Sequence, residues 1–180
     1  AWLPILAHGR AIRCGAYAIT GGLGGLGLRS AVLLSECGAV RVLLGSRHGR
    51  TAEHTMSKHP ASSLRRSAFA VLACDVAELC DVGALFGAHH GFEGLLHAAG
   101  VNDRGLLIEA SPGRMCCVFA PIASGAWHLH GTTTASPLET RMFFSSVSSG
   151  LSNAGQSSYA AGNVWLDAHA RSLRVYGRAG

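Results

Sequence analysis

Three polar side chains in the second half of the chain are spaced so that they could meet around a reacting group. Ser146 closes a short apolar run, residues 142–146, that predicts a strand. Tyr159 follows 13 positions later, and Asn163 lies four residues beyond it within a predicted helix over 156–176. Because residues four apart share one face of a helix, the phenol and the amide should be neighbours. A phenol can exchange a proton with a reacting group, and a hydroxyl and an amide beside it can add hydrogen bonds.

A glycine-rich segment near the start of the chain indicates a second kind of chemistry, the binding of a phosphate. Residues 17–20 predict a strand and residues 30–37 a helix, and the sequence from residue 20 to residue 27 reads TGGLGGLG. Glycines permit a tight turn and let backbone N–H groups approach a pyrophosphate, to which the helix N-terminus adds a favourable dipole. Glycines also serve ordinary turns, but a strand, a glycine loop and a helix in this order favour the binding interpretation.

A second predicted strand, over 41–45, ends near an arginine that bears on the identity of the nucleotide. Enzymes that use NAD place a carboxylate here to bind the ribose 2′-hydroxyl, whereas an arginine suits the 2′-phosphate of NADPH. Arg47 follows this strand, and the sequence contains no Asp or Glu between Cys37 and Ala52. The residues therefore favour NADPH over NADH, with a solvated surface arginine as the alternative.

The elements that position these residues alternate between short apolar runs and longer helical stretches. Strands are predicted at residues 17–20, 41–45, 67–74, 94–97 and 142–146, and helices at residues 30–37, 78–89, 112–132 and 156–176. Strands that alternate with helices form parallel sheets through right-handed crossovers. We therefore expect an α/β fold, a Rossmann-like doubly wound parallel sheet flanked by helices. The chain ends directly after the helix that carries Tyr159, where such a sheet normally adds a strand, so we expect a truncated domain.

The composition excludes several other classes of protein. The chain has 180 residues, enough for one domain, and 48% of them are hydrophobic, which is too many for a disordered chain. Only residues 51–66, rich in Ser and His, are expected to form a disordered insert. The net charge of +5 comes from arginines spread along the chain, without the clusters typical of a nucleic-acid surface. No apolar run reaches the roughly 18 residues of a membrane span. From the spread of the arginines and the short apolar runs, we expect neither nucleic acid nor a membrane as a partner.

Cysteine and histidine usage argues against a metal site. The six cysteines contain no C-x-x-C pair, and several lie inside apolar runs, so we expect free thiols. The ten histidines include adjacent and alternate pairs, but these pairs lack carboxylate or cysteine partners at ligand spacing. We therefore expect no bound metal.

Several sequence blocks resemble one known family. Residues 143–170, FFSSVSSGLSNAGQSSYAAGNVWLDAHA, resemble the signature of the ketoreductase (KR) domains of polyketide synthases and animal-type fatty acid synthases, within the short-chain dehydrogenase/reductase superfamily. The blocks HAAGV (97–101) and SGAWHLH (124–130), and the T-G-x-x-x-G-x-G spacing of the glycine loop, are similar to further parts of that family in the same order. The resemblance implies a KR domain over residues 15–180 that lacks its C-terminal part, after a linker or edge segment over 1–14.

The resemblance also implies a reaction, with a role for each candidate residue. The family uses NADPH to reduce the β-ketone of a β-ketoacyl thioester, held on an acyl carrier protein, to a β-hydroxyl group. Tyr159 would protonate the developing alkoxide, Ser146 would hold the carbonyl oxygen, and Asn163 would position a water or backbone group in the proton relay. Asp75, after the third strand, would approach the adenine or would cap the next helix. The residues expected to contact NADPH are Thr20, Gly21, Gly22, Leu23, Gly25, Leu26, Gly27, Ser46, Arg47, Cys74, Asp75, Val76, His97, Ala98, Ala99 and Gly100.

The same resemblance implies a biological setting. The expected partners are a carrier-bound acyl substrate and the other synthase domains of one polypeptide, and the expected process is polyketide or fatty acid biosynthesis. The expected location is the cytoplasm, with an organelle of a eukaryote as the alternative.

One position departs from the family's pattern. The family carries a lysine 24 positions before the serine, in a block similar to A-P-K-x-x-G-A-W, whereas this chain reads APIASGAW and places Ile122 there. The only lysine in the chain is Lys58, and Arg114 lies eight residues before Ile122, on another helical turn. One alternative is therefore a catalytically impaired NADPH-binding or scaffold module. Another, a stand-alone dehydrogenase for a small alcohol, would normally show Y-x-x-x-K, and Asn163 occupies that lysine's position.

Overall fold

The computed structural model describes residues 13–49, 68–102, 105–136, 138–151 and 154–176. These ranges cover nearly the whole of every predicted helix and strand. Most of the expected linker over 1–14, the expected insert over 51–66 and residues 177–180 lie outside the described residues.

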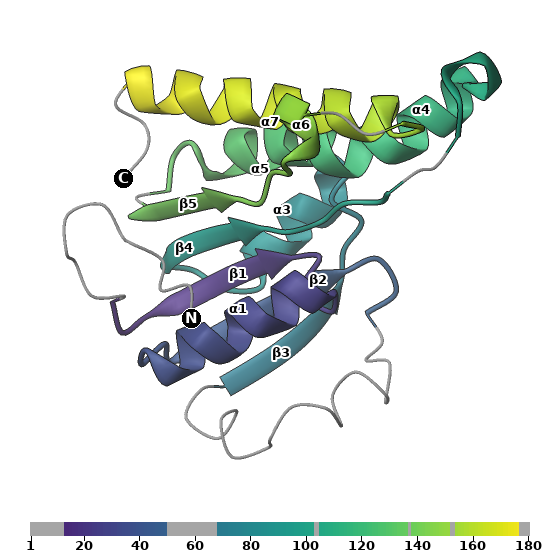
Figure 1. The fold of residues 1–180 in the computed structure, drawn as a ribbon. Coiled ribbons are helices and arrows are strands. Elements are labelled where there is room, and N and C mark those ends of the chain that lie inside the picture. Colours follow the sequence, from purple (N-terminus) through teal and green to yellow (C-terminus); the bar gives the residue numbers. More distant parts are fainter. Residues whose placement is uncertain (1–12, 50–67, 103–104, 137, 152–153, 177–180) are drawn as a thin grey trace.

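Five parallel strands form one sheet in the described part of the chain. They are β1 (Ala16–Thr20), β2 (Arg41–Ser46), β3 (Ala68–Ala73), β4 (Phe92–His97) and β5 (Thr140–Phe143). Their order is β3-β2-β1-β4-β5, and all four pairs are parallel (Figure 1). The strand order reverses between β1 and β4, which is the point where doubly wound sheets bind ligands, beyond the carboxyl ends of the strands. The predicted Rossmann-like sheet is confirmed.

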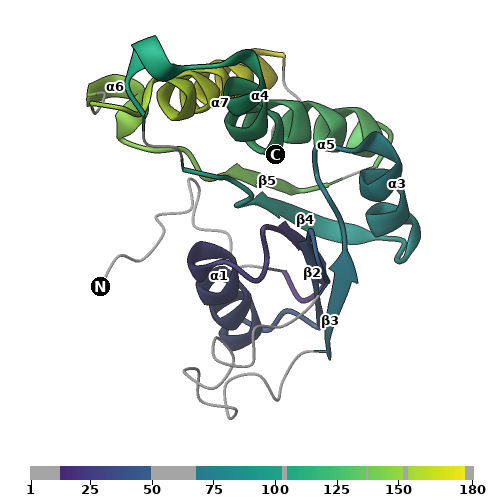
Figure 2. The same ribbon diagram turned by 90° about the vertical axis from the view of Figure 1, so that its right-hand side faces the viewer.

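Helices cover both faces of this sheet (Figure 2). One face packs against α1 (Gly25–Glu36), and the other packs against α3 (Leu79–Gly87) and α5 (Gly125–Thr133). Neighbouring residues of β1 point to opposite faces, Ala18 toward α3 and α5 and Ile19 toward α1, and both are fully buried. A strand that is apolar on both sides is what a parallel sheet covered on both faces requires.

A further group of helices lies beside β5. The helix α7 (Ser157–Val175) packs against α4 (Pro112–Phe119) and the turn η3 (Ala120–Ser124), as Figure 1 shows. Ile122 and Leu166 belong to the buried cluster at this contact. Within the described ranges, α7 is the longest helix at 19 residues, and none of the helices there is long and apolar enough to cross a membrane.

The single helix predicted over 112–132 is wrong in one respect, because a π-helical turn, η3, interrupts it. Pro121 explains the interruption. It has no N–H to donate to the Cys117 carbonyl, and its ring crowds that carbonyl in a regular α-helix. The turn widens instead, and single π turns of this kind occur frequently at functional sites.

The segment that carries the candidate serine also differs from its prediction. β5 ends at Phe143, so Ser146 lies beyond the strand and not at its end. A hydroxyl–backbone bond from Ser149 Oγ to the Ser146 carbonyl (2.8 Å) competes with strand pairing there. The short helix α6 (Ser148–Leu151) follows, and the sequence analysis predicted neither α6 nor the turn η2 (Leu107–Glu109) after β4.

Candidate active site

The glycine loop joins β1 to α1 through a turn that requires glycine. Gly21 has a φ of +65°, and a Cβ on it would lie 2.5 Å from the carbonyl oxygen of Ala98. The N–H of Gly24 donates to the Gly21 carbonyl at 2.9 Å, and Gly24, which has no side chain that could cap, is the N-cap of α1. The first N–H groups of the helix therefore point toward any anion bound at this end.

Two other glycines of the loop differ in what a side chain would meet. At Gly27 a Cβ would collide with the Gly21 carbonyl oxygen and lie 2.7 Å from the Gly22 Cα, so the packing of the loop on α1 requires glycine. At Gly25 a Cβ would meet no described atom within 4 Å. The fold therefore does not require a glycine at position 25, and the space in front of it is open to a ligand.

A pocket of about 200 Å³ opens beside this loop at the carboxyl ends of the strands. Nine of the sixteen residues expected to contact NADPH line it, namely Gly21, Ser46, Arg47, Cys74, Asp75, Val76, Ala98, Ala99 and Gly100. The pocket has three further lining residues that were not predicted, Gly24, Val101 and Pro121. Gly24 and Val101 belong to motif blocks already singled out and could have been included on that ground. Pro121 comes from η3, and only the fold brings it to the pocket.

The charged groups of the pocket come from Arg47 and Asp75. Arg47 follows β2 and is exposed, so its guanidinium is free to turn toward an anion in the pocket. Asp75 Oδ1 accepts from the Ala77 N–H at 3.0 Å, while the Asp75 N–H donates to Asp81 Oδ2 at 2.8 Å. The N-cap of α3 is Glu78, so the helix-cap interpretation of Asp75 is wrong. Its carboxylate instead closes a local turn at the pocket wall.

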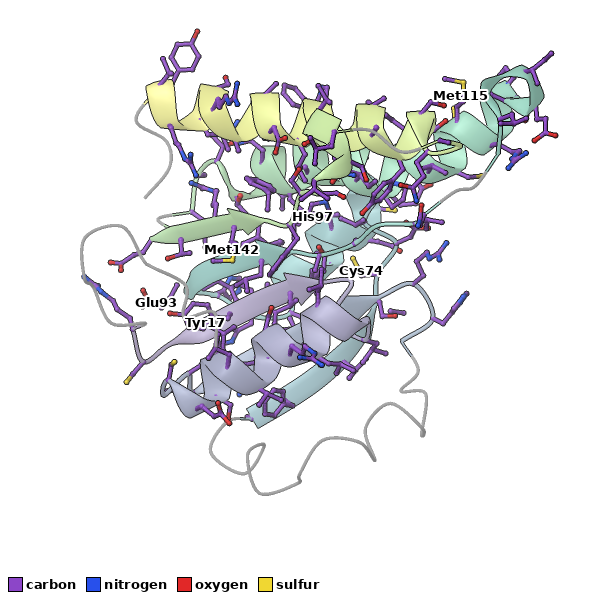
Figure 3. All side chains as sticks on the ribbon, in the orientation of Figure 1. Tyr17, Cys74, Glu93, His97, Met115 and Met142 are labelled. Atoms are coloured by element: carbon purple, nitrogen blue, oxygen red, sulfur yellow. The ribbon has the colours of Figure 1, made fainter. Side chains whose placement is uncertain are left out.

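Cys74 forms an uncharged part of the same wall. Figure 3 shows its thiol near the carboxyl end of the sheet. Burial raises the pKa of Cys74 to about 11, and the carboxylates of Asp81 and Asp75 act in the same direction. The thiol therefore stays protonated at neutral pH and is a weak nucleophile.

The other seven expected NADPH contacts do not line this pocket; they are Thr20, Gly22, Leu23, Gly25, Leu26, Gly27 and His97. Their situations differ. The Leu26 side chain is 56% exposed on α1, whereas Gly22 and Gly27 are buried within the loop packing. Thr20 and His97 are each 1% exposed, and their side chains bind one another.

His97 connects two parts of the chain that are distant in sequence. Its Nδ1 lies 2.7 Å from Thr20 Oγ1, and its Nε2 lies 3.0 Å from the Ile122 carbonyl oxygen. A carbonyl only accepts, so Nε2 carries the hydrogen and Nδ1 accepts from the Thr20 hydroxyl. Burial lowers the pKa of His97 to about 4, although the bond to Ile122 opposes the shift, so the ring is neutral at neutral pH. Figure 3 shows it between β4 and the helices that lie over the sheet.

The polar cluster predicted from the sequence comes from the loop after β5 and the first turns of α7. Ser146 Oγ donates to Ser148 Oγ at 3.2 Å, and Ser148 Oγ donates to Oε1 of Gln156, the N-cap of α7, at 3.3 Å. The buried Asn163 donates from Nδ2 to the Tyr159 carbonyl at 2.8 Å. One hydrogen-bonded chain thus connects the serine to the tyrosine helix, although no bond between described residues joins Ser146 directly to Tyr159 or Asn163.

Ile122 lies between the pocket and the tyrosine. It is 3% exposed and belongs to the buried cluster against which Tyr159 packs. Its Cδ1 would lie 3.3 Å from a Cβ on Gly162 of α7, and its Cγ1 would lie 3.6 Å from a Cβ on Gly100 at the pocket wall. The position of the family's lysine is therefore occupied by an apolar side chain in contact with both parts of the site.

A group of aromatic rings lies between α5, α7 and β5. His169 stacks on Trp165 with ring centroids 4.9 Å apart, and the rings of Trp127, His130 and Phe143 also surround it. Burial and the neighbouring His130 lower the pKa of His169. No group of three or more His, Cys, Asp or Glu side chains in the described ranges is placed to hold a metal ion.

The chain is similar to one protein family and to several curated proteins. The model of the family described as "KR domain" matches residues 15–180. The chain is 40% identical over 173 residues to the spectinabilin polyketide synthase system protein NorB of Streptomyces orinoci, and 36% identical over 168 residues to a naringenin synthase of Pestalotiopsis fici. These matches cover 91% and 89% of this chain but only 8% and 6% of the relatives, so the chain spans a small part of each.

Solved structures give the same result. The first ketoreductase of the tylosin polyketide synthase superposes with a TM-score of 0.84 at 35% identity, covering 96% of this chain and 38% of that one. A-type ketoreductases from a modular polyketide synthase superpose with a TM-score of 0.86 at 28% identity, covering 97% of this chain and 38% of theirs.

Proposed function

Since the chain belongs to the KR domain family, the ketoreductases of polyketide synthases, we propose that it uses NADPH to reduce a β-ketoacyl thioester to a β-hydroxyacyl thioester. The observation that carries this proposal is the pocket at the carboxyl ends of the strands, where the glycine loop, Arg47 and Asp75 come together. Doubly wound sheets bind nucleotides at this place.

The residues of the pocket fit a dinucleotide with a 2′-phosphate. The open space in front of Gly25 and the free N–H groups at the start of α1 suit a pyrophosphate. Arg47 supplies a cation at the end of β2, the position at which a carboxylate would instead select NADH. The absence of Asp and Glu from residues 38–51 favours the phosphorylated cofactor for the same reason.

The residues of the polar cluster suit the proton-transfer part of the reaction. When bound, the nicotinamide would supply the hydride. Tyr159 would donate its phenolic proton to the oxygen that becomes the alcohol, and Ser146 would donate a hydrogen bond to the same oxygen. Asn163 would keep the tyrosine backbone in place through the bond to its carbonyl.

The proposed setting follows from the relatives. Because the chain spans only a few per cent of each curated synthase, we place it beside other synthase domains in one polypeptide, with an acyl group on a carrier protein as substrate. Polyketide synthesis is the process that the relatives support, and fatty acid synthesis is the more distant alternative. We place the protein in the cytoplasm.

A second candidate function, a KR-type module that binds NADPH but turns over slowly, is favoured by Ile122. The buried isoleucine gives Tyr159 an apolar neighbour where the family's lysine would give it a cation. The titratable ring bonded to this residue's carbonyl is His97, and a ring with a pKa near 4 carries no charge at neutral pH. Neither Ile122 nor His97 would then give Tyr159 a neighbouring positive charge.

One experiment tests the leading function. In the intact natural protein, NADPH oxidation that depends on a β-ketoacyl thioester surrogate should be lost by roughly 10²–10⁴-fold in Tyr159→Phe, while NADPH binding stays unchanged. Tyr176→Phe, at the exposed end of α7, is the matched control and should retain activity. Activity that is equal in the parent and in Tyr159→Phe would refute the assigned role of the tyrosine.

A further inference from the structure

We propose that His97 is a positioning residue that braces the end of β1 against the π-helical turn η3. The brace would hold the nucleotide pocket and the residues that pack against Tyr159 at a fixed distance and orientation relative to each other. Sequence analysis placed Thr20 and His97 among the NADPH contacts, whereas their side chains are directed at one another. The kinetic consequence of the brace rests on the proposed function, but the brace itself does not.

Both nitrogen atoms of the buried ring are used. The Thr20 hydroxyl donates to Nδ1 across 2.7 Å, and Nε2 donates to the Ile122 carbonyl across 3.0 Å, both good lengths for hydrogen bonds. The bonds span 77 and 25 residues of sequence, so each fixes a long-range relation. Because a buried nitrogen without a partner is costly, removal of the Thr20 hydroxyl should disturb the ring and not only the threonine.

The three bonded residues stand beside the functional parts of the site. Thr20 directly precedes Gly21 of the glycine loop. The Thr20 carbonyl accepts from the Ala98 N–H at 3.0 Å, at the start of the pocket wall after β4. On the other side, Pro121 lines the pocket while Ile122 packs in the cluster that includes Tyr159. The imidazole therefore lies between the walls of the pocket and the tyrosine's support.

The turn η3 is a place where such a brace matters. Its packing neighbours are the helices α4, α5 and α7, and the bond from His97 joins it to the sheet. Space around the ring is tight, since a Cβ on Gly125, the residue after the turn, would lie 3.3 Å from His97 Cε1. A loosened ring would let the turn shift against the sheet and carry the Tyr159 contact with it.

The brace is tested first without any ligand. In the intact protein, ¹⁵N NMR should show the neutral Nε2–H tautomer for His97. Thr20→Val keeps the shape of the side chain but removes the donor, and amides of residues 122–126 should exchange with solvent about tenfold faster in this variant. Thr20→Ser keeps the hydroxyl and should exchange like the parent. An Nδ1–H tautomer in the parent, or unchanged exchange in Thr20→Val, overturns the proposal.

The kinetic arm separates positioning from a general loss of stability. With NADPH and a β-ketoacyl thioester surrogate, Thr20→Val should lower kcat about tenfold at an unchanged KM for the thioester, and Thr20→Ser should restore it. If Thr20→Val does not fold, Thr20→Ala replaces it with the same expectations. Equal losses in the valine and serine variants, or a loss of kcat with unchanged exchange at 122–126, overturn the proposal. A parent without reductase activity refutes the proposed function alone, because the ligand-free measurements still decide the brace.

Discussion

The two halves of the site differ in whether all of the residues expected for the proposed reaction are present. In the nucleotide half, around β1, β2 and β3, the glycine loop, Arg47 and Asp75 are all present and share one pocket. In the catalytic half, around η3 and α7, Tyr159 and Asn163 are present, but an isoleucine replaces the expected cation. Under the proposed function, NADPH binding and turnover would depend on separate residues, so that one could weaken while the other is kept.

The physical reason for this separation is that Ile122 satisfies the packing of the catalytic half. An isoleucine at 3% exposure contributes buried apolar area to the contact of η3 with α7, which a charged group could not do without a partner. The catalytic half can therefore fold without a charge at position 122, because only the proposed reaction would need that charge.

A lysine at position 122 should supply the cation that the catalytic half lacks, and it should increase turnover more than any other change considered. Ile122→Lys should raise ketone-dependent NADPH oxidation on the order of a hundredfold, because a cation about 4 Å from the phenol at an effective dielectric of about 20 contributes up to ~4 kcal/mol. NADPH affinity should stay within about threefold of the parent. Stopped-flow turnover and a fluorescence titration measure the two quantities.

The control for this change is Ile122→Met, which alters the shape but adds no charge and should give no gain. The lysine variant will be less stable because its ammonium enters a buried site, so its folding must be checked by circular dichroism. A folded Ile122→Lys without any gain would show that the missing cation does not limit turnover in the catalytic half.

The role of Arg47 can be tested in the nucleotide half. Arg47→Ala should weaken NADPH binding by about ten- to a hundredfold and leave NADH binding unchanged, because a charge-assisted contact to the 2′-phosphate is lost. Titration of nicotinamide fluorescence with both cofactors measures this. Arg29→Ala, an exposed arginine on α1, serves as the matched control. Equal affinities for the two cofactors in the parent would contradict the assignment of NADPH.

A pair of glycine variants separates packing from ligand contact within the nucleotide half. Gly25→Ala should leave the free energy of unfolding unchanged but weaken NADPH about tenfold, because the methyl group enters open space that the pyrophosphate would approach. Gly27→Ala should instead lower the free energy of unfolding by about 1–3 kcal/mol, because its methyl group would strike backbone atoms. Urea unfolding and cofactor titration distinguish them, and the interpretation fails if Gly25→Ala is the less stable variant.

A modest pH dependence of stability is expected from His97, whose two hydrogen bonds connect the two halves. The pKa of His97 falls from about 6.5 in the unfolded chain to about 4 in the folded protein, so protons bind preferentially to the unfolded chain. The stability due to the neutral ring is therefore present above pH 6.5 and is lost as the pH falls toward 4. Between pH 6.5 and 5.5 the loss should be about 1 kcal/mol.

Urea unfolding of the parent and of His97→Gln at these two pH values tests this. The other titrating groups are common to both proteins, so the difference between their pH slopes isolates His97. Parallel slopes would show that the ring is not held neutral.

The strands of the parallel sheet and the glycine loop could be predicted from the sequence because they depend on local patterns. Apolar runs such as Ala16–Thr20 are read directly, and the glycines of residues 21–27 sit where a tight turn must follow β1. The interruption at η3 was missed, although Pro121 was a usable signal inside a predicted helix.

The contacts that join the two halves could not be predicted, because they depend on how crossovers place distant segments. The bond from His97 to the Ile122 carbonyl involves a backbone atom, which leaves no trace in residue type. Pro121 in the pocket wall could not be predicted either, because only the fold brings η3 to the pocket.

The π turn has a consequence for the rotational phase of the helices that it separates. A π turn uses one more residue than an α turn, and one residue corresponds to about 100° of rotation around a helix. Deletion of Pro121 would remove both the extra residue and the ring that excludes a regular α-helix, so α4 and α5 could merge into one helix, and the side chains of one of them would turn by that angle. Either Val118 of α4 or Leu129 of α5, both buried now, would then face a new direction. The extra residue thus lets α4 and α5, which follow one another through η3, direct their apolar faces differently. The face of α4 is directed to α7 and the face of α5 to the sheet.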